Sequence, residues 1–384
     1  MAYNAGMTTF DEFRALFPSA RKCIHLNHAG TSPVARPVAD AVHAVTAELT
    51  SDDPFAAYKN HQKRQETLRA GFARMTNVAA DTLGFVRNTS HGLAIVAQSI
   101  PFEPGDTVVV GRSEYPANVY PWMAQAHRGV GVRLVEPNPD GLYREEDLMD
   151  ACADASTRVL AVSWVQWGTG QRMDLARLGA LCRERGIYLV ADVVQGLGAL
   201  RLDLGALPVD FAAAGCHKWL LAPAGLGVLY VRSGVMPGLV PTNVGWNAVE
   251  DPIDWENLHF DRLKQTPERF EEGSPNLLGT AALGASVSLL EAVGFDAVER
   301  RVLEVAGYAR AALARRGMDV VTPEPVASGI VAFRHPTLSN EATLAALTEA
   351  KVVCAVRCGN VRFAPHAYSN EEDVDRAVAA IPRG

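Results

Sequence analysis

The sequence predicts an α/β protein in which a large domain, with a mostly parallel β-sheet between two layers of helices, is joined to a smaller α+β domain. Two observations support this fold class. Short apolar runs alternate with helical patterns from about residue 55 to residue 255, and most of these runs are apolar on both faces, as in strands covered by helices on both sides. From residue 279 onward, helices are followed by short strands, which is typical of a separate α+β unit.

The strands of the large domain are expected where apolar, β-rich runs occur. These runs are LGFVR (83–87), TVVVG (107–111), VRLVE (132–136), RVLAVSWV (158–165), IYLVAD (187–192), VDFAAAG (209–215) and GVLYVR (227–232). Helical patterns lie between several of them. In LARLGALCRERG (175–186), leucines recur at helical spacing before a glycine that favours a helix end. Strands separated by helices indicate parallel pairing.

The C-terminal part begins with one long helical stretch. That stretch covers 279–317 and is followed by a strand at 329–335, a helix at 340–350, strands at 352–357 and 361–365, and a final helix at 370–381. We predict that residues 1–20 form an N-terminal segment that packs on the small domain. Residues 21–270 then form the large domain, and residues 271–384 form the small α+β domain.

Composition excludes several classes of protein. The formal net charge is −7 and the 36 Lys and Arg residues are scattered, so no basic surface for nucleic acid is indicated. No apolar run approaches the ~20 residues that a membrane span needs, and the first residues lack the pattern of a secretory signal. We therefore expect a cytoplasmic protein. The six cysteines are thinly spread, which indicates reduced thiols, and no metal site is expected.

Three chemical signals fall at the carboxyl ends of predicted strands, where open parallel sheets bind ligands. Asp192 closes an apolar strand, and Gln195 follows three residues later. Lys218 lies twenty-six residues beyond Asp192, in an otherwise apolar segment after the next strand. Thr89 and Ser90 follow the strand at 83–87 and open a helical pattern, a position that suits a phosphate group.

Each signal alone has a simpler interpretation: a helix cap for the hydroxyls and for Asp192, and an amine that reaches solvent for Lys218. Together they fit pyridoxal phosphate. This cofactor needs a lysine for its Schiff base, a carboxylate for its ring nitrogen and donors for its phosphate. The protonated ring withdraws electrons from the substrate carbanion, and the lysine also serves as the base that moves the α-proton.

The sequence resembles the class V aminotransferase and cysteine desulfurase group of fold-type I pyridoxal-phosphate enzymes over nearly its whole length. The segments that carry the resemblance are HLNHAGTSPVARPV (25–38), VRNTSHGLAIVA (86–97), EYPANVYPW (114–122), VADVVQGLGALRLDLGALPVDFAAAGCHKWLLAPAGLGVLYV (190–231), FEEGSPNLLG (270–279) and RCGNVRFAPHAYSNEEDVDRAV (357–378). Asp-x-x-Gln followed by His-Lys is the most specific of these patterns.

For the cofactor, the resemblance implies a role for each matching residue. Lys218 would hold the aldimine, Asp192 would pair with the ring nitrogen and Gln195 would approach the phenolic oxygen. The implied phosphate ligands are His217, Thr89 and Ser90.

Further residues are expected around the ring and at a second subunit. Tyr115, with Asn118 as a polar neighbour, is a candidate beside the ring because of its place in EYPAN (114–118), and the family pattern does not itself imply either residue. Ser274 matches a position that reaches the phosphate of a neighbouring subunit, which implies a homodimer with shared sites. A turn-capping role for Ser274 is almost equally consistent with the sequence Ser-Pro-Asn.

On the substrate side, Arg362 matches the arginine that binds the substrate carboxylate, a role suited to a bidentate guanidinium. A structural ion pair is its alternative. Arg357 would be a second contact, and Ala29 and Gly30 would line the same side.

The sequence also departs from the family pattern. Desulfurases carry a catalytic cysteine on a mobile loop between the positions of Arg357 and Arg362, whereas only CGNV separates these two residues here. We therefore expect Cys358 to be a buried bystander. Gly215 replaces a hydroxyl residue near the phosphate, and Trp167 stands where desulfurases have asparagine. The stacking histidine has no counterpart, so Tyr115 as the stacking ring is a hypothesis.

These features favour a pyridoxal-phosphate enzyme that acts on a small amino acid through an α-carbanion. Among such enzymes we favour an aminotransferase that also uses a keto-acid acceptor. The alternatives are a C–S lyase similar to cysteine desulfurase, another β- or γ-eliminating lyase, or an epimerase on the same scaffold. A non-catalytic relative that binds partners is the remaining hypothesis, although it would have no use for Lys218.

Overall fold

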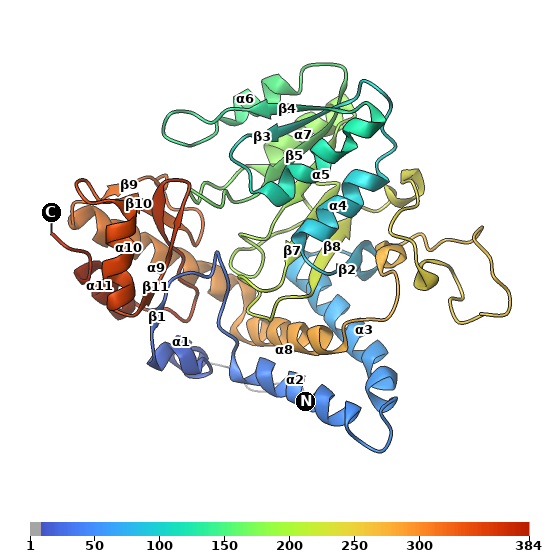
Figure 1. The fold of residues 1–384 in the computed structure, drawn as a ribbon, viewed down its shortest axis with the longest axis horizontal. Helices are drawn as coiled ribbons and strands as arrows, with labels where there is room; N and C mark the ends of the chain where they lie inside the picture. The colour runs from blue at the N-terminus through green and yellow to red at the C-terminus, as the bar shows by residue number, and fades with distance from the viewer. Residues whose placement is uncertain (1–8, 384) are drawn as a thin grey trace.

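The computed structural model describes residues 9–383, and its centre is a seven-stranded sheet with the order β2-β8-β7-β6-β5-β3-β4 (Figure 1). The strands are β2 (Leu83–Val86), β3 (Thr107–Gly111), β4 (Gly131–Val135), β5 (Thr157–Ser163), β6 (Tyr188–Asp192), β7 (Phe211–Gly215) and β8 (Gly227–Val231). Only β8 runs antiparallel to its neighbours, while the other pairs are parallel. The predicted mostly parallel sheet is confirmed.

Helices cover both faces of this sheet. The helices of the chain are α1 (Phe10–Ala15), α2 (Arg36–Leu49), α3 (Ala56–Thr76), α4 (Thr89–Ser99), α5 (Tyr120–Met123), α6 (Glu145–Ala151), α7 (Leu175–Arg185), α8 (Leu277–Val293), α9 (Phe295–Arg315), α10 (Asn340–Glu349) and α11 (Glu371–Ala379). Val108 and Val110 of β3 belong to the core that contains α4 and α5. Val109, between them, belongs to the core that contains α3, α6, α7 and α8. This alternation follows the two-residue period of a strand.

The small domain contains an antiparallel sheet with the order β12-β13-β10-β9. Its strands are β9 (Asp319–Val320), β10 (Val331–Arg334), β12 (Ala355–Arg357) and β13 (Asn360–Phe363). The apolar faces of α9 and α11 cover this sheet in a separate core. The predicted single helix at 279–317 was wrong in one respect. It is broken at Gly294, where the backbone has φ 92° and α8 meets α9 at 81°, a conformation that a residue with a side chain rarely adopts.

The two parts of the chain are connected at both ends of the sequence. Strand β1 (Ile24–His25) pairs in parallel with β11 (Val352–Val353), and Arg14 forms an ion pair of 2.6 Å with Asp373. Helix α8 packs on α2 and α3, where Leu277 and Ala281 contact a small apolar cluster. The division at residues 20 and 270 stays a prediction, and residues 1–8 of the N-terminal segment lie outside the described residues.

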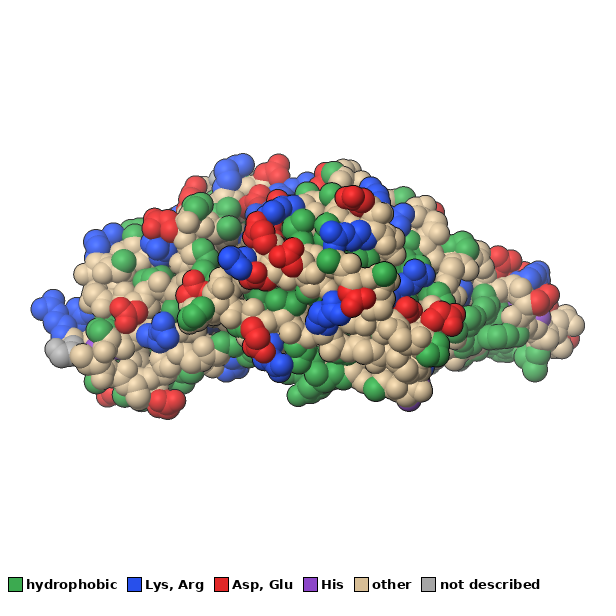
Figure 2. All heavy atoms as spheres, turned by 90° about the horizontal axis from the view of Figure 1, so that it is seen from above, with side chains coloured by type: hydrophobic (Ala, Val, Ile, Leu, Met, Phe, Trp, Pro, Cys, Tyr) green, Lys and Arg blue, Asp and Glu red, His purple; other side chains and the backbone are tan. Residues whose placement is uncertain are grey.

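A long connection between β8 and α8 projects from the molecule (Figure 1, in yellow). We call residues 244–263 the apolar arm, because large hydrophobic side chains are strongly exposed on it. They are Val244, Trp246, Ile253, Trp255, Leu258 and Phe260. Leu258 is 92% exposed and Ile253 is 79% exposed. Figure 2 shows hydrophobic side chains gathered near this projecting end.

Across residues 9–383, no single helix is both long and apolar enough to cross a membrane. The sharply bent pair α8 and α9 reaches the required length and composition only when the two helices are taken together.

Candidate active site

The candidate site lies at the carboxyl ends of neighbouring parallel strands. Asp192 is the last residue of β6 and pairs in register with Ala213 of β7. Strand β7 ends at Gly215, and Lys218 follows three residues later. The parallel pairing therefore brings Asp192 and Lys218 to the same edge of the sheet, although twenty-six residues separate them in the sequence.

Asp192 is buried, with only 3% of its surface exposed. Its Oδ1 accepts a hydrogen bond of 3.0 Å from the backbone N–H of Val194. Burial raises the pKa of Asp192 to about 7, while this hydrogen bond and the charge of Lys218 oppose the rise and Glu114 adds to it. A buried carboxylate that faces one cation suits a cationic ring nitrogen.

The amine of Lys218 is also removed from water. Burial lowers its pKa from 10.5 to about 8, Asp192 opposes this effect, and Arg362 and Arg357 add to it. The lysine Nζ lies 5.6 Å from the centre of the Tyr115 ring. An amine with this pKa is a much better nucleophile at neutral pH than a solvated lysine.

The predicted phosphate ligands converge on the N-terminus of α4. Thr89 is buried, and its Oγ1 accepts a hydrogen bond of 2.8 Å from the backbone N–H of Gly215. A Cβ at Gly215 would lie 3.2 Å from Nδ1 of His217 and 3.3 Å from Oγ1 of Thr89. Glycine therefore allows these two side chains to approach each other. Ser90 is exposed on the first turn of the same helix, and burial lowers the pKa of His217.

Gln195 connects the sheet to the N-terminal segment. Its Nε2 donates to the carbonyl of Ala29 at 3.0 Å, and its Oε1 accepts from Nε1 of Trp219 at 3.0 Å. Gly30 leaves room for the Asn27 side chain, which a Cβ would meet at 2.7 Å. The structure thus brings Ala29 and Gly30 to this side of the sheet. The contact of Gln195 with a phenolic oxygen stays a prediction.

Arg362, on β13, is a deeply buried cation. Only 1% of its surface is exposed. Its Nη1 donates to the carbonyl of Trp167 at 2.6 Å and its Nη2 donates to Oδ1 of Asn27 at 3.3 Å, while its buried Nε has no hydrogen-bond partner. Among residues 9–383 no carboxylate forms an ion pair with it. Burial lowers the pKa of Arg362 to about 10, and the charge of Arg357 adds to this effect, so a bound anion would stabilise this buried cation.

Arg357 and Cys358 occupy a tight hairpin between β12 and β13. Arg357 pairs with Asn360, and Cys358 and Gly359 form the turn with φ 49° and 73°, as in a two-residue hairpin. Arg357 is exposed, and its Nη1 donates to the backbone carbonyl of Val356 at 2.7 Å. The prediction that Cys358 is buried was wrong, because a turn residue faces solvent. Its Sγ nevertheless packs on Gly168, where a Cβ would lie 2.6 Å away.

The remaining predicted residues differ in their surroundings. Tyr115 is 46% exposed and meets the edge of Trp167 with ring centres 5.3 Å apart. Asn118 is fully buried beside Glu114. Ser274 is exposed on the segment before α8, and no hydrogen bond joins it to any residue in the described part of the chain.

Sequence reasoning missed Glu114 and Ser163, which form a buried polar group with Gln166 behind the site. Glu114, Ser163 and Gln166 are each at least 95% buried. Ser163 is the last residue of β5 and pairs in register with Asp192. Glu114 follows the end of β3 by three residues. That position was the only available signal, because nothing in the local sequence distinguishes a buried glutamate from a solvated one.

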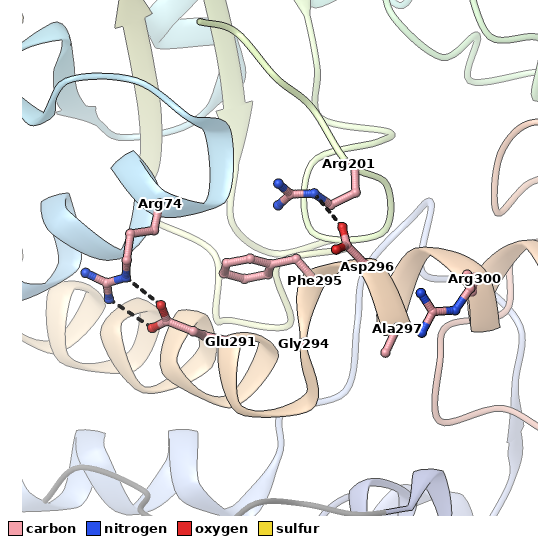
Figure 3. Close-up of a pocket in the computed structure, with 8 residues that line it drawn as sticks. All are labelled: Arg74, Arg201, Glu291, Gly294, Phe295, Asp296, Ala297 and Arg300. Atoms are coloured by element: carbon pink, nitrogen blue, oxygen red, sulfur yellow. Dashed lines mark hydrogen bonds and ion pairs between the residues drawn. The ribbon is translucent and has the colours of Figure 1, made fainter.

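A surface pocket of about 530 Å³ lies elsewhere, at the bend between α8 and α9 (Figure 3). Arg74 and Glu291 form an ion pair on one side of it, and Arg201 and Asp296 form another. None of the predicted site residues lines this pocket. Arg74 and Arg201 are already partnered by acids, whereas Arg300 forms no ion pair among residues 9–383, and we assign no chemistry to this pocket.

Comparison with known proteins places the chain in a family. The sequence model described as aminotransferase class-V matches residues 24–376. A probable cysteine desulfurase of Methanothermobacter thermautotrophicus is 28% identical and is matched over 95% of each chain. An uncharacterised aminotransferase of Schizosaccharomyces pombe is 26% identical over 100% of this chain and 98% of the other. The crystal structure of the cysteine desulfurase CsdA from Escherichia coli has a TM-score of 0.85 at 26% identity, over 97% of this chain and 98% of that one.

The chain belongs to the class V aminotransferase family, which is a family of pyridoxal-phosphate-dependent enzymes. The fold predicted from the sequence and the predicted class of enzyme are therefore both confirmed.

Proposed function

We propose that this enzyme transfers the amino group of a small amino acid to a keto-acid acceptor. The observation that carries the proposal is the convergence of three groups: Lys218 and Asp192 at the carboxyl edge of the large sheet, and Arg362 on β13 of the small sheet. The amine of Lys218 has a pKa of about 8, Asp192 is the acid next to it, and Arg362 is a buried guanidinium without an acidic partner in the described part of the chain.

The residues present fit pyridoxal phosphate. Lys218 would hold the cofactor covalently, and Asp192 would keep a proton on its ring nitrogen. His217, Thr89 and Ser90 would hold the phosphate at the N-terminus of α4, where the helix dipole favours an anion, and Gly215 leaves the room that this convergence requires. Bound in this way, the cofactor supplies an electron sink that acidifies the α-hydrogen of an attached amino acid.

The chain's own groups then carry out three tasks. Arg362 binds the substrate carboxylate, and this carboxylate supplies the anionic partner that no residue in the described part of the chain provides. Lys218, once free, is a base suited to moving a proton at neutral pH, because its amine is largely desolvated. Ala29 and Gly30, which Gln195 holds against the sheet, line the substrate side and restrict access of water.

A lyase that cleaves the bond from the β-carbon to sulfur is the second candidate. Relatives named cysteine desulfurase favour it. Elimination needs the same lysine, acid and arginine as amino transfer. Sulfur transfer through a cysteine thiol is disfavoured, because Cys358 lies in a two-residue turn and its Sγ packs on Gly168. An epimerase shares these residues as well.

A screen of amino acids with and without a keto-acid acceptor tests the proposal. Amino transfer predicts that the absorbance band of the lysine-bound cofactor, near 410–430 nm (about that range for such a group), bleaches with the amino acid and recovers only when acceptor is added. Release of sulfide or ammonia without acceptor would establish the lyase instead. Inversion of the α-carbon alone would establish the epimerase.

We further propose that the enzyme is a homodimer with shared active sites. The apolar arm supports this proposal, since an exposed patch of large hydrophobic side chains marks an interaction surface. Exposed Ser274 precedes α8 by three residues, and it has no partner in the described part of its own chain. A phosphate bound by the partner subunit would supply one.

A further inference from the structure

Glu114 is a buried carboxylate for which the reaction proposed above has no direct use. It is 5% exposed. Its Oε1 accepts hydrogen bonds from the backbone N–H of Ser163 at 2.7 Å and from Nε2 of Gln166 at 2.8 Å, and its Oε2 accepts a short hydrogen bond from the Ser163 hydroxyl. Burial of a carboxylate costs free energy even when donors surround it. This arrangement therefore indicates a structural or functional role for Glu114.

These bonds connect two loops that leave neighbouring strands. The β3 loop (residues 112–119) carries Glu114, and the β5 loop (residues 164–171) carries Gln166. Strands β3 and β5 are paired in parallel, so both loops start at the same edge of the sheet. A further bond of 2.9 Å joins Nε1 of Trp167 to the carbonyl of Ser113. Glu114 is the one carboxyl group among these partners, and it is buried between the two loops.

Glu114 and Gln166, which are joined by a hydrogen bond, are each followed in the sequence by a residue that contacts the site. Tyr115 follows Glu114, and its ring lies 5.6 Å from the amine of Lys218. Trp167 follows Gln166, and its carbonyl accepts the 2.6 Å hydrogen bond from Arg362. The two aromatic rings also contact each other edge to face. Movement of either loop would therefore displace both the ring beside the lysine and the anchor of the arginine.

We propose that Glu114 is a positioning residue, which locks the β3 and β5 loops together and so fixes Tyr115 beside Lys218 and Trp167 beneath Arg362. We call the hydrogen bonds of Glu114 to Ser163 and Gln166 the lock. The lock is a property of the chain alone, whereas its consequences for catalysis rest on the proposed function. The loops set where the substrate carboxylate and the cofactor ring are held, and small displacements there carry a large cost in rate or binding.

Two substitutions at Glu114 and one at Gln166 separate the effect of the hydrogen bonds between the loops from the effect of the charge. Glutamine has the shape of glutamate, and its oxygen accepts from Ser163 and Gln166 while its amide donates to the Ser163 hydroxyl. Glu114→Gln should therefore preserve the lock. Glu114→Ala removes it, and Gln166→Ala removes the half that reaches the β5 loop.

Asp210 offers a matched control at the other end of the sheet. It is 7% exposed, it accepts a 2.8 Å hydrogen bond from the backbone N–H of Leu189, and it forms an ion pair of 2.7 Å with Arg232. It precedes β7, so it lies at the strand end opposite Lys218. Asp210→Ala should cost stability without altering the loops.

The first measurement is amide hydrogen exchange on the protein without cofactor. Glu114→Ala should increase exchange at least tenfold at Ser163 and in residues 113–118 and 164–168, with a smaller increase in Gln166→Ala. Glu114→Gln and Asp210→Ala should leave these segments as in the wild type. If exchange in both loops is unchanged in Glu114→Ala, the lock does not exist and the inference is wrong, whatever the enzyme's activity.

The second measurement is the split between KM and kcat in the loaded enzyme. Glu114→Ala should raise the KM for the amino acid at least tenfold and shift the absorbance maximum of the lysine-bound cofactor, and Glu114→Gln should restore both. A lower melting temperature with unchanged KM and spectrum would reduce Glu114 to a packing residue. Wild-type protein with no cofactor band would contradict the proposed function, but the exchange result would still decide on the lock.

Discussion

At the scale of single residues, burial rather than sequence motif gives Lys218 its chemistry. Its side chain is half-buried, and the charges of Arg362 and Arg357 act in the same direction as desolvation. Asp192 partly offsets them, so the amine is about half neutral near pH 8. A lysine in water would be almost entirely protonated at that pH.

This pKa leads to a prediction about capture of the cofactor. When pyridoxal phosphate is added to cofactor-free protein, only the neutral amine reacts. The rate of band formation should therefore rise about tenfold per pH unit below pH 8 and level off above it. Stopped-flow absorbance across pH 6–10 measures this profile. A midpoint near 10.5, the ordinary value for lysine, would show that the amine is solvated.

Arg362 leads to a second prediction. Hydrogen bonds to charged groups are worth about 1.5–3 kcal/mol, and lysine cannot reproduce the bidentate geometry of a guanidinium. Arg362→Lys should raise the KM for the amino acid by about 10- to 100-fold. Steady-state kinetics checks this, with Arg334→Lys as the control that changes KM less than about threefold, because Arg334 is exposed at the end of β10. Equal effects of the two substitutions would show that Arg362 does not bind the substrate.

Part of the site was predictable at this scale. Asp192, Lys218 and Thr89 could be found because each lies at the end of a strand or the start of a helix, and these positions are encoded in local patterns. Glu114 and the carbonyl of Trp167 could not be found. Their roles depend on which loops meet in space, and the bond between Arg362 and Trp167 joins residues 195 positions apart.

At the scale of elements, the alternation of apolar residues predicted the sheet and its two covered faces correctly. The pattern of residues 279–317 predicted one helix, since glycine at position 294 interrupts the apolar spacing by only one residue. The structure bends there by 81°, because α8 packs against α2 and α3 while α9 covers the small sheet. Tertiary packing therefore overrode the local pattern.

The hairpin at Cys358 is a second feature of this kind. Its turn has only two residues, so it cannot carry the thiol to a distant substrate atom. Cys358→Ser should leave amino-transfer activity, and any release of sulfide with a thiol reductant present, within about twofold of the wild type. Assays of both products measure this. Loss of sulfide release with a retained cofactor band would contradict the account, since it would assign sulfur transfer to that thiol.

For the whole molecule, the apolar arm is the feature that a single folded chain does not explain. Stable interfaces bury at least about 1,200 Å² in total, and six large exposed hydrophobic side chains on one projecting segment suit a second copy of the chain. We predict that Leu258→Asp combined with Phe260→Asp yields monomers that bind pyridoxal phosphate more weakly, because Ser274 no longer reaches the partner's site.

Light scattering and cofactor titration test this prediction. Leu49→Asp is the matched control, since Leu49 is an exposed leucine at the end of α2, outside the arm, and its replacement should leave the molar mass unchanged. A wild-type protein that is already monomeric would contradict the proposed homodimer with shared active sites.

The proposed chemistry depends on a covalent bond between Lys218 and the cofactor. The most direct measurement is reduction of the holoenzyme with borohydride, which makes this linkage permanent, followed by proteolysis and mass spectrometry of the peptides. A pyridoxyl modification is expected on Lys218 and on no other lysine. Modification of a different lysine, or no modified peptide at all, would contradict it.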